Sequence, residues 1–315
     1  MVQVIIKGNS IITLKEGDMD LKQLEYIVEI AKERNVTHAA EKLFISQSAL
    51  NQQLLKLERE LGTQLFHRNR TDWQLTEVGE IYVENAKVIL GIQKEAYKKI
   101  YDCLEEYKGK LSIGLSPGRG IEIFIKIFKK LHSFYPDLKI EPVEVSVFQQ
   151  QEKIARGELD IGMMTLAEYQ QTKDNYIVIN SEEMVLITSK DHPFNDDPVS
   201  KKPVDLTFFK DEPFVLLNKN STNRGVIDKL FETAGYQPEI LFETAYTSSI
   251  ISAVKGGLCC GIVPLYYAKK NAEHLSYFPI KGHPSWDIVI SYKKGTYLSK
   301  PAQKFIQLTR EHFQK

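Results

Sequence analysis

The fold is decided by residues 37–76, THAAEKLFISQSALNQQLLKLERELGTQLFHRNRTDWQLT. Apolar residues recur there every three or four positions, which is the spacing that gives an α-helix one buried face. Ser46 is a good N-cap and Gly62 a good left-handed C-cap, so we predict a helix between them. Its predicted inward residues are Ala49, Leu50, Leu54, Leu57 and Leu61.

Two shorter helices are predicted before this one. Residues Leu21 to Arg34 place apolar side chains on one face, which indicates a supporting helix. Thr37 is the predicted N-cap of a second helix, in which Ala39 and Ala40 allow another helix to cross closely. After the third helix, residues 65–75 indicate a small hairpin with cations at its tip. Together these elements predict a winged helix-turn-helix.

The outward face of the third helix is polar. Amide side chains pair bidentately with base edges in the major groove, and hydroxyls reach bases or phosphates. At the hairpin tip, Arg68 and Arg70 are expected to contact the phosphate backbone. The candidate DNA contacts are therefore Thr37, Ser46, Gln47, Ser48, Asn51, Gln52, Lys56, Arg68 and Arg70.

An ordinary three-helix bundle with a polar face fits the same spacing. Between Met19 and Glu80, eight Lys or Arg residues stand against ten Asp or Glu residues, so this segment has no general positive field. If it binds DNA, the affinity must come from local placement of cations and from doubling by dimerisation.

One set of positions within and just after this segment carries a family resemblance. The set is Ala39-Ala40, Leu43, Ser46-Gln47, Ala49, Leu57-Glu58, Leu61-Gly62, Leu65-Phe66, Arg68, Leu75-Thr76 and Gly79. It resembles the pattern of the LysR-type transcriptional regulators. Over Met19 to about Phe313, the resemblance implies an α/β protein: an N-terminal winged helix-turn-helix, a long linker helix and a two-subdomain, periplasmic-binding-protein-like α/β sensor domain. Three positions depart from the family pattern and leave base preference and wing fit open: Asn51, Arg70 and Trp73.

Composition excludes several classes of protein. The 315 residues are 43% hydrophobic, enough for two or three packed domains, and 41 Lys or Arg balance 41 Asp or Glu. No run is long and apolar enough to span a bilayer, so we expect no membrane partner and a cytoplasmic location. We expect no cofactor and no metal, because the seven histidines show no ligand spacing. The pair Cys259-Cys260 predicts small buried side chains, with a redox sensor as the alternative.

The chain also suggests segment boundaries. We expect residues 1–18 to be a non-native or disordered extension, because the first helix begins naturally at Met19 and Lys15 to Asp18 can be encoded as a ribosome-binding sequence. The other expected segments are a winged helix-turn-helix at 19–76, a linker and dimerisation helix at 77–108, and an effector-binding domain at 109–315. Its expected subdomains are I, at about 109–181 and 282–315, and II, at about 182–281.

A single long helix is predicted from Thr76 to Tyr107, a segment with no proline and two glycines, Gly79 and Gly91. Its side chains alternate steps of four and three, the seam of a coiled coil. The predicted seam is Tyr82, Ala86, Ile89, Gln93, Ala96, Ile100, Cys103 and Tyr107. The seam packs either on its own domain or on a second chain. A second chain would make a homodimer or homotetramer whose two heads read two half-sites.

After Gly109, short β-branched strands alternate with helices in the order βαβαβ, which predicts a parallel sheet covered on both faces. The predicted elements are strand Leu111–Leu115, helix Ile121–Tyr135, strand Lys139–Val147, helix Gln149–Arg156 and strand Leu159–Met164.

Ligands of such sheets bind at the carboxyl ends of the strands. The first such end, Ser116 to Gly120, leads into a helix whose N-terminal amides favour an anionic group, with Arg119 as a clamp for carboxylate or phosphate. The alternative is a glycine-rich turn with a solvated Arg119.

The family resemblance implies a small-molecule effector between the two subdomains. The contacts it implies are Ser116, Pro117, Gly118, Arg119, Asn220, Ser221, Thr222, Thr247, Ser248 and Ser249. Plain helix capping explains Ser248 and Ser249 equally well.

An effector-controlled transcription factor accounts for every segment. Its expected partners are double-stranded operator DNA, a small effector with an anionic group, and RNA polymerase. A solute-binding protein without a transcriptional role explains only the C-terminal half. An enzyme is disfavoured, because the sequence shows no nucleophile elbow, no phosphate loop and no metal-ligand spacing.

Overall fold

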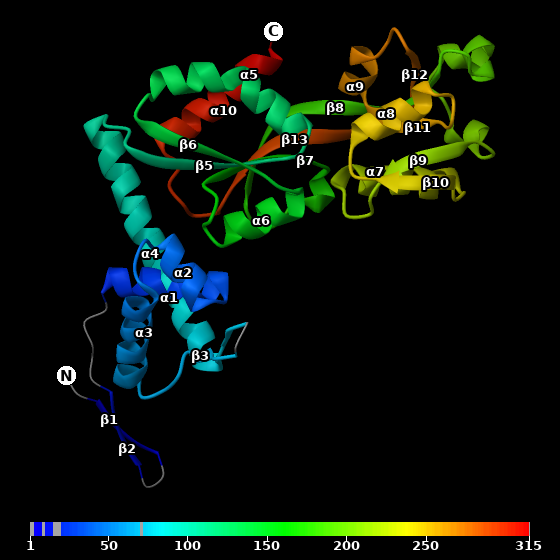
Figure 1. Cartoon of the computed structure of the whole chain (residues 1–315). Coiled ribbons are helices and arrows are strands. Elements are labelled where there is room, and N and C mark those ends of the chain that lie inside the picture. Colours follow the sequence, from blue (N-terminus) through cyan, green and yellow to red (C-terminus); the bar gives the residue numbers. More distant parts are fainter. Residues whose placement is uncertain (1–2, 8–9, 15–19, 70–71, 315) are drawn as a thin grey trace. The chain divides into compact units, whose positions relative to one another are not determined.

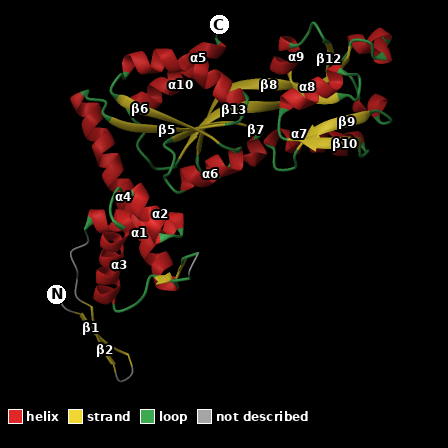
Figure 2. Ribbon diagram, viewed as in Figure 1, coloured by secondary structure: helices red, strands yellow, loops and turns green. Residues whose placement is uncertain are grey.

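The computed structural model describes residues 3–7, 10–14, 20–69 and 72–314 (Figures 1 and 2). The chain divides into two compact units, Met1–Ile100 and Tyr101–Lys315. Within the described residues, no helix combines the length and hydropathy needed to cross a membrane.

The N-terminal unit contains the predicted winged helix-turn-helix. Its elements are α1 (Leu21–Glu33), α2 (Val36–Lys42), α3 (Gln47–Leu61), β3 (Phe66–His67) and β4 (Gln74–Leu75). The three helices pack around a core that includes Ile27, Ala39 and Leu54. The strands β3 and β4 pair antiparallel, with Phe66 opposite Leu75, and form the wing.

Local capping explains where these helices begin and end. Ser46 accepts a hydrogen bond from the amide of Ala49, and Gly62 ends α3 in the left-handed conformation, as predicted. The predicted cap of α2 was wrong. Asn35, not Thr37, caps that helix, because its Oδ1 accepts from the amides of Thr37 at 2.8 Å and His38 at 3.2 Å. The helix starts at Val36, whose side chain is buried in the core.

The inward face of α3 differs from the prediction at one position. Leu50, Leu54 and Leu57 are buried and Leu61 is half-buried, but Ala49 is exposed. Consecutive helical residues point about 100° apart, so Ala49 falls beside the buried face rather than on it.

A short hairpin precedes the helix-turn-helix in the chain. The strands β1 (Gln3–Lys7) and β2 (Ser10–Leu14) pair antiparallel. The expectation that residues 1–18 are a non-native or disordered extension stays a prediction. Both strands are rich in β-branched residues, which favour extended backbone. The expected start residue, Met19, lies outside the described residues.

The long helix α4 (Glu77–Leu104) confirms the predicted element but not all of its seam. It ends before Tyr107, where Glu105 adopts a left-handed φ of 56°. Near its start, Val83 and Ala86 are buried, because this turn packs into the N-terminal core. The exposed large apolar side chains of α4 are Val78, Ile81, Val88, Ile92, Tyr97, Ile100 and Leu104. Ile100 of the predicted seam is thus exposed, whereas Ile81, Val88 and Ile92 form a stripe rotated from that seam.

In the C-terminal unit, helices cover both faces of a seven-stranded sheet of order β11-β8-β13-β7-β5-β6, with β12 paired to β8. The strands β5 (Gly109–Leu115), β6 (Leu138–Glu144) and β7 (Ile161–Leu166) pair in parallel. They alternate with α5 (Arg119–Phe134) and α6 (Val147–Ala155), which confirms the predicted βαβαβ order. Val147, predicted in a strand, instead opens α6, because Ser146 and Gln149 form a capping box there.

Two long strands join the halves of this unit. The 15-residue strand β8 (Asn175–Ser189) pairs antiparallel with β13 (Ser285–Tyr292). At one end they share a core with α5 and α10 (Lys300–Phe313). We call this half of the unit subdomain I; it also contains β5, β6, β7 and α6. At the other end, Met184, Leu186 and Trp286 belong to a second core.

That second core belongs to subdomain II. Its elements are β9 (Pro213–Leu217), α7 (Thr222–Ala234), β10 (Glu239–Thr244), α8 (Thr247–Lys255), β11 (Gly261–Pro264), α9 (Leu265–Lys270) and β12 (Leu275–Pro279). Short 3₁₀ helices occupy the connections: η1 (Glu168–Gln170), η2 (Pro193–Asp196), η3 (Pro198–Lys201) and η4 (Leu206–Phe209). The expected boundary near residue 182 falls inside β8.

Candidate DNA-binding and effector sites

The exposed face of α3 carries most of the predicted DNA contacts. Gln47, Ser48, Gln52 and Lys56 are exposed, and Asn51 is half-buried. All five come from one helix of four turns, so they share a rigid backbone. The face therefore presents amides and hydroxyls side by side, which suits the edges of base pairs. Two other candidates differ: Ser46 caps α3, and Thr37 lies exposed on α2.

Arg68 has a partner that the sequence did not reveal. Its guanidinium forms an ion pair with Glu58, a buried residue of α3 that also accepts the amide of Leu65 at 2.9 Å. The same guanidinium lies 5.5 Å from the centre of the Trp73 ring. This arrangement fixes the wing against α3. Contact of Arg68 with phosphate stays a prediction, and Arg70 lies outside the described residues.

In the C-terminal unit, the end of β5 is closed by polar contacts. Ser116 is buried, its hydroxyl lies 3.3 Å from the Met163 carbonyl, and it accepts from Nε2 of Gln150 at 3.3 Å. Gly118 has a φ of 73°, and a Cβ there would lie 3.1 Å from the Tyr267 hydroxyl. Pro117 and Gly118 are exposed. Only glycine fits this backbone so close to Tyr267 without strain.

Arg119 is buried, so the alternative of a solvated Arg119 is wrong, and its role as a clamp for an anionic group stays a prediction. Arg119 is 4% exposed, and its Nε donates to Glu182 at 2.9 Å, so its charge already has a partner. Trp286 donates to the other carboxylate oxygen of Glu182 at 3.4 Å. The Arg119 guanidinium also lies 3.6 Å from the Tyr266 ring centre. Its Nη1 has no hydrogen-bond partner among the described residues, so one buried donor remains.

The start of α7, in subdomain II, is hydrogen-bonded to subdomain I. The Thr222 hydroxyl donates to the Thr165 carbonyl at 2.7 Å, and Nε2 of Gln170 donates to the Thr222 carbonyl at 3.1 Å. The next residue, Asn223, is 1% exposed, and both of its amide atoms lack partners within the described chain. Ser221 precedes the helix as its N-cap but makes no side-chain capping bond, and Asn220 is exposed.

The serines of α8 do not cap that helix. Its N-cap is Tyr246, no side chain completes the cap, and Ser248 is exposed. Thr247 and Ser249 are half-buried within the first turn. The capping alternative for Ser248 and Ser249 is therefore wrong. The orphaned groups that sequence reasoning missed, on Asn223 and Gln150, carry no local motif; only burial without a partner reveals them.

Burial also sets the acid–base state of nearby groups. It raises the pKa of the Tyr267 hydroxyl, and the Glu122 carboxylate adds to the effect, so this phenol stays a donor at neutral pH. Burial, followed by Glu212 and Cys259, raises the pKa of the Cys260 thiol to about 12. Burial also raises the pKa of Cys259. Neither thiol has the thiolate character of a redox sensor, which weakens that alternative.

Family models match both units. Residues 21–80 match the bacterial regulatory helix-turn-helix protein of the lysR family, and residues 104–314 match the LysR substrate binding domain. The chain belongs to the LysR family. It is thus a transcriptional regulator with a DNA-binding helix-turn-helix and an effector-binding domain. The helix-turn-helix is the part that a solute-binding protein alone leaves unexplained, and the family consists of transcriptional regulators, not enzymes.

Individual LysR relatives cover nearly the whole chain. The Hca operon transcriptional activator HcaR of Escherichia coli (strain K12) is 30% identical over 297 residues, which are 93% of this chain and 98% of that protein. The HTH-type transcriptional regulator YcgK of Bacillus subtilis (strain 168) is 28% identical over 307 residues, covering 93% and 94%.

Solved structures share the fold. A full-length OxyR variant from Pseudomonas aeruginosa superposes with a TM-score of 0.70 at 23% identity, covering 94% of this chain and 95% of that one. Full-length CbnR, solved in complex with its target DNA, has a TM-score of 0.57 at 18% identity, covering 93% and 99%.

Proposed function

We propose that this LysR regulator reads operator DNA through the exposed face of α3. The observation that carries the proposal is the row of exposed amides and hydroxyls on that helix, Gln47, Ser48 and Gln52. The LysR-type fold is shared with CbnR, which was solved in complex with its target DNA, and this supports DNA binding by the chain. Lys56 and the wing arginines would add phosphate contacts, which position the protein without reading sequence.

The chain is proposed to act as a homodimer or homotetramer. The exposed stripe of Ile81, Val88 and Ile92 on α4 supports this, because steps of seven and four place these side chains on one helix face. A second copy would bury the stripe and bring two helix-turn-helix modules to one operator. A dimer would also bind DNA more tightly than one copy. This matters because the N-terminal unit has no excess of positive charge, so a single copy has little electrostatic affinity for DNA. RNA polymerase is the proposed partner at the promoter.

The effector is proposed to bind between subdomains I and II. The buried orphans Nη1 of Arg119 and the amide of Asn223 support a polar ligand, since such groups need partners. Because Glu182 already neutralises Arg119, amide and hydroxyl groups are expected to dominate recognition, and an anionic effector would rely on Nη1 and helix-start amides. The other effector contacts, among them Ser116, Thr222 and Ser248, stay predictions. Binding acts on DNA only through different affinities for two arrangements of the dimer.

The decisive experiment compares two glutamines of α3. Footprinting across the genome first finds the operator, and fluorescence anisotropy then measures binding to it and to random duplex. Gln47→Ala is expected to lower discrimination at one base position by about 1–3 kcal/mol. Gln53→Ala is the matched control, since Gln53 is also exposed on α3 but lies off the proposed reading face.

Equal losses on operator and random DNA in Gln47→Ala would contradict the assignment. The same holds if Gln53→Ala lowers discrimination as much as Gln47→Ala. A chain that binds no operator at all in the footprinting step would overturn the proposed function as a whole.

A further inference from the structure

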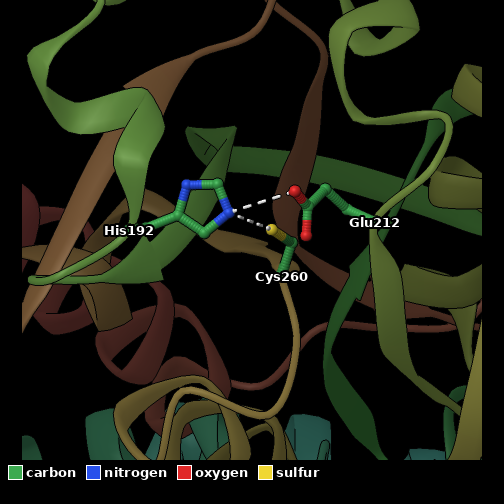
Figure 3. A group of neighbouring side chains, drawn as sticks. All are labelled: His192, Glu212 and Cys260. Carbon is green, nitrogen blue, oxygen red and sulfur yellow. Dashed lines mark hydrogen bonds and ion pairs between the residues drawn. The ribbon is translucent and has the colours of Figure 1, made fainter.

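Three side chains of kinds that bind metal ions meet in subdomain II: His192, Glu212 and Cys260 (Figure 3). Nε2 of His192 lies 3.7 Å from Sγ of Cys260 and 3.5 Å from Oε1 of Glu212. All three ligand atoms lie within 4.8 Å of one another. None of these residues belongs to the proposed DNA or effector sites.

These separations fit the edges of a tetrahedral site. An ion bound at about 2.3 Å from sulfur and about 2.0–2.2 Å from nitrogen and oxygen holds tetrahedral ligands roughly 3.3–3.6 Å apart. The observed 3.7 Å and 3.5 Å therefore need little movement to close on an ion. A set of one thiolate, one imidazole and one carboxylate suits Zn²⁺ or Co²⁺, whereas Mg²⁺ and Ca²⁺ prefer oxygen ligands.

The backbone holds the three donors in place. Cys260 directly precedes β11, and its amide donates to the Pro213 carbonyl at 2.9 Å. Because Pro213 follows Glu212, this hydrogen bond holds Cys260 close to Glu212. The loop that carries His192 is braced by Asn195, whose amide donates to the Ser189 carbonyl at 3.0 Å. The donors thus come from three separate segments that are fixed independently of an ion.

Exposure to solvent increases from Cys260 to His192 to Glu212. The Cys260 residue is fully buried, while the side chains of His192 and Glu212 are 15% and 40% exposed. The cluster is closed on its sulfur side and open on its carboxylate side. An open side leaves a coordination position for water, as in sites with three protein ligands.

We propose that His192, Glu212 and Cys260 bind one divalent ion of the zinc class, with solvent as the fourth ligand. On binding, the Cys260 thiol releases its proton and Nε2 of His192 offers its lone pair. The ring proton then resides on Nδ1, which at present accepts the Phe194 amide at 3.2 Å. Ion binding therefore breaks this one hydrogen bond, and that loss gives a second signature of the site.

The test titrates reduced, chelator-stripped, untagged full-length protein with Co²⁺, followed by Zn²⁺. We expect one Co²⁺ per chain, a thiolate-to-cobalt absorption band in the near ultraviolet, and loss of the band when Zn²⁺ is added. The Phe194 amide should exchange its hydrogen faster in the loaded protein. Cys260→Ser should abolish the band, and His192→Gln or Glu212→Gln should weaken binding about tenfold or more.

Matched controls separate this site from the other thiols. Cys259→Ser, which removes the adjacent thiol, and Cys103→Ser, which removes an exposed one, should leave the band unchanged. If circular dichroism shows that Cys260→Ser is unfolded, Co²⁺ binding by His192→Gln and Glu212→Gln, whose replaced side chains are partly exposed, tests the site instead. The proposal fails if wild type shows no band, if the band survives in Cys260→Ser, or if both exposed-ligand variants bind as wild type. Operator binding is not involved, so its failure is a separate result.

Discussion

The two units each bury a glutamate against an arginine, but they seal the pair to different degrees. In the N-terminal unit, the Arg68 side chain is 30% exposed while Glu58 is 6% exposed. In the C-terminal unit, the side chains of Arg119 and Glu182 are 5% and 7% exposed. A partly exposed arginine keeps water on one side, so hydration compensates part of the loss of its partner. A sealed arginine has no such compensation.

The difference reflects what each pair holds. Glu58 and Arg68 lie ten residues apart and attach the wing to the helix proposed to read DNA. Arg119 and Glu182 lie 63 residues apart and attach the first helix of subdomain I to the strand that crosses into subdomain II. The same chemistry therefore shapes a surface element in one unit and a buried crossing in the other.

The largest effect is expected from breaking the sealed pair. Glu182→Gln leaves the Arg119 charge buried without a counterion, which should destabilise the C-terminal unit by about 3–5 kcal/mol. Urea unfolding would be followed by Trp286 emission in a Trp73→Phe background, because each unit contains one of the two tryptophans. The double variant Arg119→Met with Glu182→Leu should recover most of the loss. A single variant as stable as the wild type would show that the pair is not needed.

A smaller effect is expected from the partly exposed pair. Glu58→Gln keeps an acceptor for the Leu65 amide but removes the charge opposite Arg68, which should cost about 1–3 kcal/mol. Trp73 emission in a Trp286→Phe background reports this unit. The loosened wing should weaken binding to operator and random DNA alike. Selective loss at the operator alone would mean that the pair serves base reading and not wing placement.

The smallest effect is expected from an exposed pair of similar geometry. Lys130 of α5 and Glu311 of α10 form an ion pair at 2.7 Å on the surface of the C-terminal unit. Water and salt screen such pairs, so Glu311→Gln should leave the unfolding midpoint unchanged in the Trp286 assay. A shift as large as that of Glu182→Gln would refute burial as the cause of the ranking.

Local chemistry made much of the fold predictable. Ser46 and Gly62 bound α3 because capping depends on the residue itself and its nearest backbone neighbours. The βαβαβ order followed from short alternating runs, and its boundaries shifted by only a few residues. The α4 seam was partly mispredicted, because a helical pattern does not say which apolar face the N-terminal core will take first.

The sites were less predictable, because their residues are far apart in the sequence. Arg119 was selected from its loop, but Glu182 is remote in sequence, so the neutralisation of its charge could not be foreseen. His192, Glu212 and Cys260 likewise have no ligand spacing along the chain, and the histidines were read as carrying none. The bridge between Phe214 and Cys260 brings Glu212 to Cys260, and the loop after β8 adds His192.

The sequence by itself determined the LysR-type architecture, the polar face of α3 and the order of strands and helices, since periodicity and caps act over one or two turns. The tertiary structure decided which charges are already paired, which polar groups are left without partners and which thiol meets a histidine. Those outcomes depend on segments that meet only in the folded chain, and their energies depend on burial, which no local pattern encodes.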